Sequence, residues 1–256
     1  MRWQPGATSA RSAWAVGFTG TGEAFKALIL RWNGRAWKRV PSPEPAGGGQ
    51  LNGVAVTSAR NAWAVGQTGS GKALILRWNG KVWKQVSSPS PAGSFLGVAA
   101  TSAGSVWAVG YSITSSGSKT LIERWDGTSW KRIPAPSPAG GILTGVAATS
   151  ARSAWAVGEY GSGKALILRW NGTVWKRVPS PAPADSLLNG VAATSARGAW
   201  AVGTVIERWN GKVWKLVRTP AGELRGVAAT SAQNAWAAGY TGSKTLILRW
   251  NGRTWK

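Results

Sequence analysis

The sequence contains no cysteine and no histidine among its 256 residues. Without cysteine the chain has no disulfide, no thiolate nucleophile and no sulfur ligand for a metal, and the redox compartment stays open. Without histidine it lacks the side chain that most often serves as a general base and as a metal ligand. We therefore expect no cofactor and no metal centre.

Acidic residues are scarce as well. Eight Asp and Glu stand against 31 Lys and Arg, which gives a formal net charge of +23. Glycoside hydrolysis usually needs two carboxyl groups within about 10 Å of each other. Glu123 and Glu207 replace a Leu that other repeats carry, but each precedes an Arg, so we expect local ion pairs. We predict that the protein is not an enzyme.

Long apolar runs are also missing. No stretch approaches the roughly 20 apolar residues of a membrane-spanning helix. Residues 1–5 carry no apolar core of the kind found in a signal peptide. We expect no membrane span and no signal peptide in this sequence, which leaves the location of the protein unknown.

Six copies of one cassette fill the chain. Each copy carries the tetrad W-A-(V/A)-G, then R-W-(N/D)-G, then a Trp-Lys pair, and successive tetrads lie 36 to 49 residues apart. Repeats of this length that consist of short strands are typical of propeller blades. We predict one all-β domain over 1–256, a six-bladed β-propeller of four-stranded antiparallel blades. The blades are expected at about 1–41, 51–88, 96–135, 143–180, 188–218 and 224–256.

Each cassette predicts four strands, here given for the second copy. The first, 51–57, has small side chains that suit an innermost strand, and the second, 62–66, ends at a Gly that readily takes a positive φ. The third, 73–78, is almost wholly apolar, as in strands covered on both faces. An Asn-Gly pair, a strong hairpin signal, separates it from the fourth, 82–86. Pro-rich segments then predict extended connectors between blades.

Two known repeat families share parts of this cassette. The motif W-(N/D)-G-x-x-W, at 78–83 in the second copy, resembles the Asp-box (BNR-like) repeat. The small-residue strand, the strand ending in Gly and the Trp after a polar turn resemble bacterial kelch repeats. Only one turn keeps Asp, at Asp126, and the kelch Gly pair is reduced to a single Gly. The resemblance implies a β-propeller and suggests an extracellular or cell-surface protein; Asp-box propellers include sialidases and other glycoside hydrolases.

Eighteen of the 19 Trp fall at three fixed cassette positions. A large aromatic side chain that every blade requires is better suited to the packing between blades than to one binding site. We predict that these indoles are structural. This tryptophan-rich composition alone is therefore no evidence for a sugar-binding surface.

Phe18 and the three Tyr mark a variable loop after the tetrad Gly, between the second and third strands. In a propeller this loop shares a face with the connectors between blades, and that face commonly binds ligands. Lysines occur in the same loop, so we predict ligand binding there. The alternative is that the rings only cover the edge of each blade. The candidate ligand-binding residues are Phe18, Tyr111, Tyr160, Tyr240, Lys72, Lys119, Lys164 and Lys244.

The remaining basic residues recur in register. The third-to-fourth hairpins and the S-A-R turns are expected on one face, opposite the Tyr-bearing loops. Their charge favours binding of polyanions, or serves only solubility. No nucleic-acid-binding motif is present, so sequence-specific recognition of nucleic acid is not expected.

Together these features predict a non-enzymatic, lectin-like binding module or interaction scaffold with a basic surface. The expected partner is a carbohydrate or an anionic polymer, such as a cell-envelope polymer or an acidic protein, and the chain is expected to be a monomer. One alternative is a designed or recently amplified repeat scaffold without a specific ligand. A glycoside hydrolase-like enzyme is a less favoured alternative.

Overall fold

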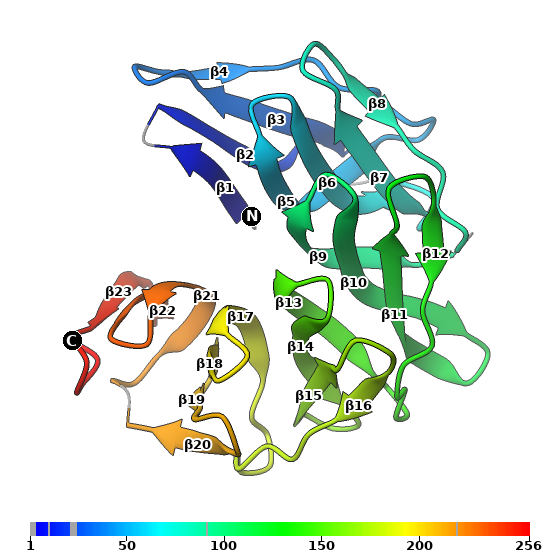
Figure 1. The fold of residues 1–256 in the computed structure, drawn as a ribbon. Coiled ribbons are helices and arrows are strands. Elements are labelled where there is room, and N and C mark those ends of the chain that lie inside the picture. The colour runs from blue at the N-terminus through cyan, green and yellow to red at the C-terminus, as the bar shows by residue number, and fades with distance from the viewer. Residues whose placement is uncertain (1–3, 10, 21–24, 91, 219) are drawn as a thin grey trace. The chain divides into compact units, whose positions relative to one another are not determined.

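The computed structural model of the protein describes residues 4–9, 11–20, 25–90, 92–218 and 220–256 (Figure 1). None of these residues lies in a helix, so the described chain offers no helix that could cross a membrane. Trp3, the one Trp outside the cassette pattern, lies outside the described residues. The all-β class that the repeats predict is confirmed.

The chain divides into two compact units, one of residues 1–113 and 121–133 and one of residues 114–120 and 134–256. Each sheet is antiparallel and follows the order of the chain. Such consecutive sheets are the blades of a β-propeller, and the described residues form six of them, as predicted; five have four strands, and the sixth has three strands and an isolated bridge. That all six belong to one domain stays a prediction.

The first unit holds blades one to three, except residues 114–120 of blade three. Blade one consists of β1 (Gln4–Ser9), β2 (Ser12–Thr19), β3 (Lys26–Trp32) and β4 (Trp37–Arg39). Blade two consists of β5 (Gly49–Ser58), β6 (Asn61–Thr68), β7 (Ala73–Trp78) and β8 (Trp83–Gln85). Blade three consists of β9 (Ser94–Ser102), β10 (Ser105–Thr114), β11 (Gly117–Trp125) and β12 (Trp130–Arg132).

The second unit holds blades four to six. Blade four consists of β13 (Ile142–Ser150), β14 (Ser153–Tyr160), β15 (Lys164–Trp170) and β16 (Trp175–Arg177). Blade five consists of β17 (Leu188–Ser195), β18 (Gly198–Gly203), β19 (Ile206–Trp209) and β20 (Trp214–Val217). Blade six consists of β21 (Glu223–Ser231), β22 (Asn234–Thr241) and β23 (Lys244–Trp250), and its fourth strand is reduced to the bridge between Trp250 and Trp255.

The Asn or Asp of each third-to-fourth hairpin closes the turn through its side chain. Asn79 Oδ1 accepts hydrogen bonds of 2.9 Å from the backbone N–H groups of Lys81 and Val82, and Gly80 follows with φ of 98°. Asp126 accepts the equivalent bonds from Thr128 and Ser129. Because Asn and Asp both present Oδ1 at this position, they can replace each other in the motif.

The S-A-R turns lie against these hairpins, as predicted. Trp78 Nε1 donates a hydrogen bond of 3.1 Å to the carbonyl oxygen of Ala59. A Cβ atom on Gly80 would lie 3.2 Å from Arg60 Cγ, and the same closeness recurs between Gly172 and Arg152. Exposed cations from both kinds of turn therefore gather at one end of blades one, two and five.

The tetrad Gly is needed for a reason that differs from the prediction. Gly66 and its equivalents do not have positive φ. The preceding strand has a register shift between Leu51 and Gly53, which brings its backbone close to the tetrad Gly. A Cβ atom on Gly66 would lie 2.0 Å from the carbonyl oxygen of Gln50, so any side chain would collide with it. Gly is therefore required at this position because no side chain fits, and not because of its backbone angles.

The first strands of neighbouring blades also approach each other closely. A Cβ atom on Gly145 in β13 would lie 3.2 Å from the Cα of Gly190 in β17, and one on Gly190 would lie 3.3 Å from the Cα of Gly226 in β21. The small residues predicted for the innermost strand are therefore required by packing between blades.

Tryptophan packing confirms the structural interpretation of the indoles. Inside the two units, each tetrad Trp contacts both cassette Trp of the following blade. Trp155 lies 4.8 Å from Trp209 and 5.0 Å from Trp214, measured between ring centroids. Fifteen of the 18 cassette Trp are buried; the exceptions are Trp32, Trp37 and Trp236.

An arginine completes each of these clusters. The guanidinium of Arg169, on β15, lies 5.2 Å from the ring of Trp155 and 5.4 Å from the ring of Trp209 in the next blade. Arg31, Arg77 and Arg208 each contact two indoles in the same way. These half-buried cations stabilise the junctions through cation–π contacts and hence are not free to bind a ligand.

Replacing Trp155 by Ala is predicted to lower the free energy of unfolding by about 3–5 kcal/mol, because it empties a packed junction. The matched control is Trp236→Ala, the same change at the same cassette position in blade six, where the side chain is exposed. We expect that variant to lose about 1 kcal/mol or less. Urea denaturation followed by circular dichroism measures both, and equal losses would contradict the role of the junctions.

Candidate functional site

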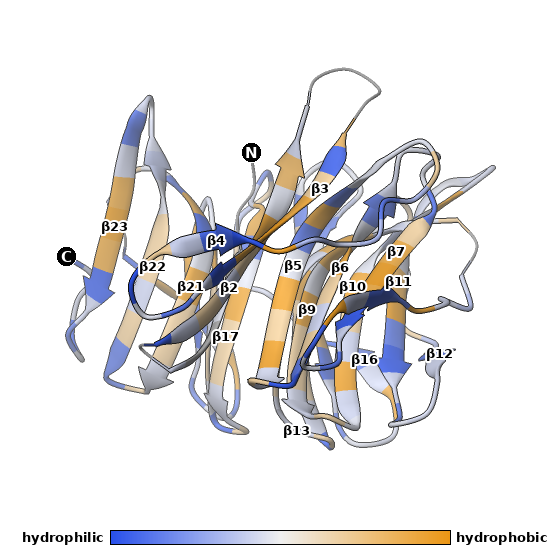
Figure 2. Ribbon diagram, turned by 90° about the horizontal axis from the view of Figure 1, so that it is seen from above, coloured by the Kyte–Doolittle hydropathy of each residue, from blue (hydrophilic) through white to orange (hydrophobic). Residues whose placement is uncertain are grey.

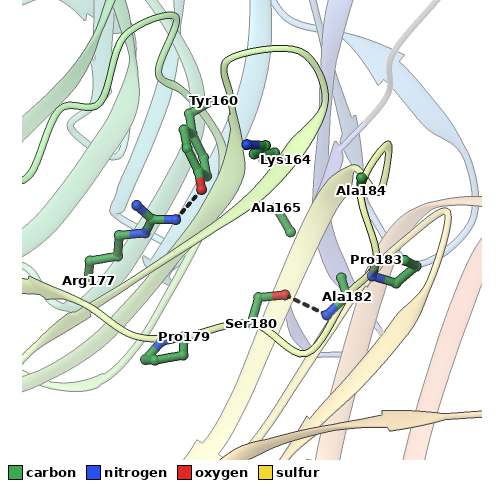
Figure 3. A pocket seen from close by; sticks show the side chains of 9 residues that line it. All are labelled: Tyr160, Lys164, Ala165, Arg177, Pro179, Ser180, Ala182, Pro183 and Ala184. Carbon is green, nitrogen blue, oxygen red and sulfur yellow. Dashed lines mark hydrogen bonds between the residues drawn. The ribbon is translucent and has the colours of Figure 1, made fainter.

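A cavity of about 470 Å³ lies in the second unit, between the end of blade four and the connector that follows it (Figure 3). Its walls are Tyr160, Lys164, Ala165 and Arg177, together with connector residues 179, 180 and 182–184. The volume is within the range of small-ligand sites. No Asp or Glu lines the cavity, so its charged groups are all cations.

Tyr160 and Arg177 face each other in this cavity, as Figure 3 shows. Tyr160 ends β14 and is paired with Lys164 at the start of β15, while Arg177 ends β16. The Arg177 guanidinium lies 4.2 Å from the centre of the Tyr160 ring and donates a hydrogen bond to its hydroxyl. The ring therefore holds this guanidinium in place in a cavity that Lys164 also lines.

Ser180 fixes the connector that forms the opposite wall. Its hydroxyl donates a 2.6 Å hydrogen bond to Oε1 of Glu207, on β19 of the next blade. The same Oγ accepts a hydrogen bond of 3.1 Å from the backbone N–H of Ala182. The Pro-containing segment is thereby attached to blade five, which gives the cavity a defined wall.

Glu207 lies behind this wall and is fully buried. Burial raises its pKa to about 6, and the hydrogen bond from Ser180 opposes the shift. Its second oxygen, Oε2, has no hydrogen-bond partner among the described residues. Glu123 in blade three is equally buried and accepts a 2.8 Å hydrogen bond from Ser88, and burial raises its pKa too.

The predicted ion pairs of these two carboxyl groups are wrong. Neighbouring residues of a strand point to opposite faces, so Glu207 and Arg208 diverge. Arg208 lies over Trp200 and Trp250, and Glu207 binds Ser180. The Glu thus pairs with a Ser of the preceding connector. Glu replaces Leu in the blades that follow Ser88 and Ser180, but Ser42 holds the same place before the blade that keeps Leu76, so the Ser alone does not signal the pair.

Of the eight predicted site residues, the structure brings Tyr160 and Lys164 together in one cavity. Tyr240 is engaged by its own blade, since its hydroxyl donates a 2.5 Å hydrogen bond to Glu223 and accepts one of 2.7 Å from Arg225. The ring of Phe18 packs edge-on against Phe25 at 5.0 Å. These two aromatics are held within their own blades.

The other four predicted residues line neither of the cavities described here. Tyr111 is half-buried and pairs with Ser94 between β10 and β9. Lys119 is half-buried in β11, and Lys72 and Lys244 are exposed beside their turns. Sequence reasoning missed Arg177 and Ser180, because their place beside Tyr160 depends on the path of the connector.

A second cavity, of about 450 Å³, lies in blade one of the first unit. It is lined by Arg31, which is held over two indoles, and by three further cations, Arg11, Lys38 and Arg39, and no carboxyl group belongs to its lining. Both cavities therefore favour an anionic occupant. No group of three or more potential acidic metal ligands gathers anywhere in the described chain.

Comparisons with known proteins identify the fold. No protein-family model and no curated protein matches the chain. The solved structure of YCF48 bound to D1 peptide is 20% identical with a TM-score of 0.67, and the match covers 99% of this chain and 80% of that one. The six-bladed fucose-recognising lectin of Aleuria aurantia is 12% identical with a TM-score of 0.61, over 100% and 93% of the two chains.

A third similar structure is the GH74 xyloglucanase from Xanthomonas campestris. It is 16% identical with a TM-score of 0.68, and the match covers 98% of this chain but 45% of the xyloglucanase. At these identities the similarities show a β-propeller fold that binding proteins and an enzyme share. Function has to be argued from the site.

The raised pKa of Glu207 predicts a pH-dependent stability. Between about pH 4.5 and 6 the unfolded chain ionises this group while the folded chain keeps it protonated, so stability falls as the pH rises through this window. The loss is about 2 kcal/mol and is constant above pH 6. Glu207→Gln, which cannot ionise, should become more stable relative to the wild type over the same window. Denaturation at several pH values tests this, and a pH-independent difference would contradict it.

Proposed function

We propose that this chain is a non-enzymatic binding module that recognises an acidic carbohydrate through the cavity beside Tyr160. The observation that carries the proposal is the presence of two cations, Lys164 and Arg177, in the lining of a cavity of ligand size without a carboxyl group. A sulfate or carboxylate on a sugar ring would receive charge-assisted hydrogen bonds from these two groups.

The orientation of Tyr160 favours an acidic ligand over a neutral one. Neutral sugars commonly rest on an exposed aromatic face, but the guanidinium of Arg177 covers this ring at 4.2 Å. The ring thus serves to position a cation. The exposed cations of the hairpins and S-A-R turns add a long-range attraction for a polyanion, which salt would screen.

The non-enzymatic part of the proposal rests on the carboxyl groups. Glu207 is fully buried behind Ser180, and the hydrogen bond between them uses the Ser hydroxyl as a donor within the fold. Glu207 therefore cannot reach a ligand in the cavity as an acid or a nucleophile. A lectin and a peptide-bound protein among the similar structures are in keeping with a binding role.

Kinship with the kelch-like and Asp-box repeats also belongs to this proposal. It is supported by the hairpin turns, in which the Oδ1 of Asp126, and of Asn in the other blades, accepts two backbone hydrogen bonds. The Asn-containing turns keep this geometry without the Asp that names the Asp-box motif. The kinship therefore supports the fold and adds no catalytic residue.

Isothermal titration tests the site. A heparin hexasaccharide serves as the anionic probe and maltohexaose as the neutral probe. We expect the anionic probe to bind and the neutral one not to bind. Lys164→Ala and Arg177→Ala should each weaken binding about tenfold, because each removes a charge-assisted hydrogen bond worth about 1.4 kcal/mol.

The matched control is Lys176→Ala. Lys176 is exposed on the same strand next to Arg177 but does not line the cavity. Its removal changes the net charge equally and should weaken binding less than about threefold. An equal loss of affinity in all three variants would show that diffuse surface charge binds the probe and that the cavity does not. Equal binding of maltohexaose would overturn recognition of an acidic sugar.

A further inference from the structure

The turns of blades four, five and six lie at one end of the second unit. A Cβ atom on Gly145 would lie 3.2 Å from the Cα of Gly190, and one on Gly190 would lie 3.3 Å from the Cα of Gly226. These glycines hold the same cassette position, so the inner strands β13, β17 and β21 pack in register. Arg208, beside the hairpin of blade five, donates a 3.1 Å hydrogen bond to the carbonyl oxygen of Ala232, in the turn after β21. Turns of neighbouring blades are therefore adjacent.

Each hairpin between the third and fourth strands lies against the turn between the first and second strands. A Cβ atom on Gly211 would lie 3.4 Å from the Cβ of Arg197, and one on Gly252 would lie 3.7 Å from the Cβ of Gln233. Figure 2 shows the arrowheads of β21 and β23 pointing toward the same end of blade six. We call this surface the turn end of the second unit; it consists of residues 151–152, 171–174, 196–197, 210–213, 232–233 and 251–254.

The turn end carries cations and no carboxyl side chain. Arg152, Arg197, Lys212 and Arg253 are exposed there. The opposite end is where β14 ends and where β17 and β21 begin. The acidic residues of the second unit lie at that opposite end or, in one case, in the core: Glu159, Asp185, Glu223 and the buried Glu207. The turn end is therefore a surface of one sign.

Two exposed aliphatic side chains accompany these cations. Val174 is 46% exposed and Val213 is 50% exposed, each directly before a buried Trp. Blade three carries Ser129 at the same cassette position and blade six carries Thr254, so the fold does not require an apolar residue there. The exposed valine methyl groups are therefore available to a partner.

Blade five forms the centre of this surface. Its inner strand β17 packs between β13 and β21 of the same unit, so the blades on both of its sides are in place. Arg197, Lys212 and Val213 stay exposed between these neighbours. Their exposure is therefore a property of the packed second unit.

We propose that the turn end of the second unit binds the surface of an anionic lipid bilayer. Anionic headgroups attract the cations, and the boundary between headgroups and acyl chains receives the methyl groups of Val174 and Val213. A nucleic acid or an anionic polysaccharide supplies negative charge but no apolar layer for the two valines. The lipid surface therefore fits both features of the turn end.

The cavity beside Tyr160 lies at the other end of the unit, since Tyr160 ends β14 and Lys164 begins β15. A bilayer on the turn end leaves that cavity open. Binding to lipid and binding to a saccharide are therefore separate properties of the chain.

Co-sedimentation of the full chain with vesicles tests the proposal. We expect binding to phosphatidylcholine vesicles with about 30% phosphatidylglycerol and none to phosphatidylcholine alone. Lys212→Thr should weaken binding about fivefold, because it removes one cation from the charged surface. Val213→Thr should weaken it about threefold through the loss of apolar burial. Thr173 and Thr254 hold these two positions in blades four and six, so both replacements suit the fold.

The matched control is Lys244→Thr. It removes the same charge from an exposed position at the start of β23, at the opposite end of the unit. Because this position lies away from the bilayer, vesicle binding should weaken less than about twofold.

Three results would overturn the proposal. The first is a chain that does not bind the anionic vesicles, and the second is an equal loss in Lys212→Thr and Lys244→Thr. The third is a DNA duplex of about 20 base pairs that binds as tightly as the vesicles while Val213→Thr leaves both affinities unchanged, because the turn end would then recognise charge alone. Failure of the heparin hexasaccharide to bind the cavity would change none of these results, so the two proposals fail separately.

Discussion

Each junction between blades inside the two units depends on three indoles and one guanidinium. The tetrad Trp of one blade meets two indoles of the next, one tilted and one edge-on, and an Arg lies across the first two rings. Tilted and edge-on contacts place the positive edge of one ring on the negative face of another. The guanidinium adds a cation to the same electron-rich faces.

This packing explains several unusual features of the composition. Three indoles per cassette supply the apolar surface of a chain that has little other aromatic content. Their bulk at the outer part of the blade contrasts with the Gly and Ala of the inner strands, where Gly145 and Gly190 approach neighbouring backbone. Six of the 31 cations belong to the R-W-(N/D)-G motif and lie over indoles, so the ligand-accessible charge is smaller than the total suggests.

Much of the fold could be predicted from the sequence because the same motifs recur in all six repeats. The spacing of the tetrads predicted six blades, and the recurrence of Trp at fixed positions predicted that the indoles pack between blades. The tetrad Gly was misjudged, because a positive φ and a close approach of backbone both select Gly. Only the register shift beside Gly66 distinguishes the two causes, and that shift is a property of the paired strands.

The candidate site was accessible only in part. Tyr160 and Lys164 were predicted because aromatic residues and lysines cluster in the variable loop between the second and third strands. Arg177 and Ser180 join them through the path of the connector, and Ser180 takes its place from Glu207 in the next blade. The role of Arg169 as a junction residue was hidden for the same reason, since half of its contact comes from Trp209, in the following cassette. Contacts that cross cassettes are not visible in the pattern of one cassette.

The most direct measurement of this account is a double-mutant cycle across the junction of blades five and six. Trp200 and Trp250 lie 4.9 Å apart at 59°, and each is replaced by Leu alone and together. Direct ring contact predicts a coupling energy of about 1 kcal/mol in the free energy of unfolding. Additive losses, with a coupling below about 0.3 kcal/mol, would contradict the claim that the indole contacts hold the blades together.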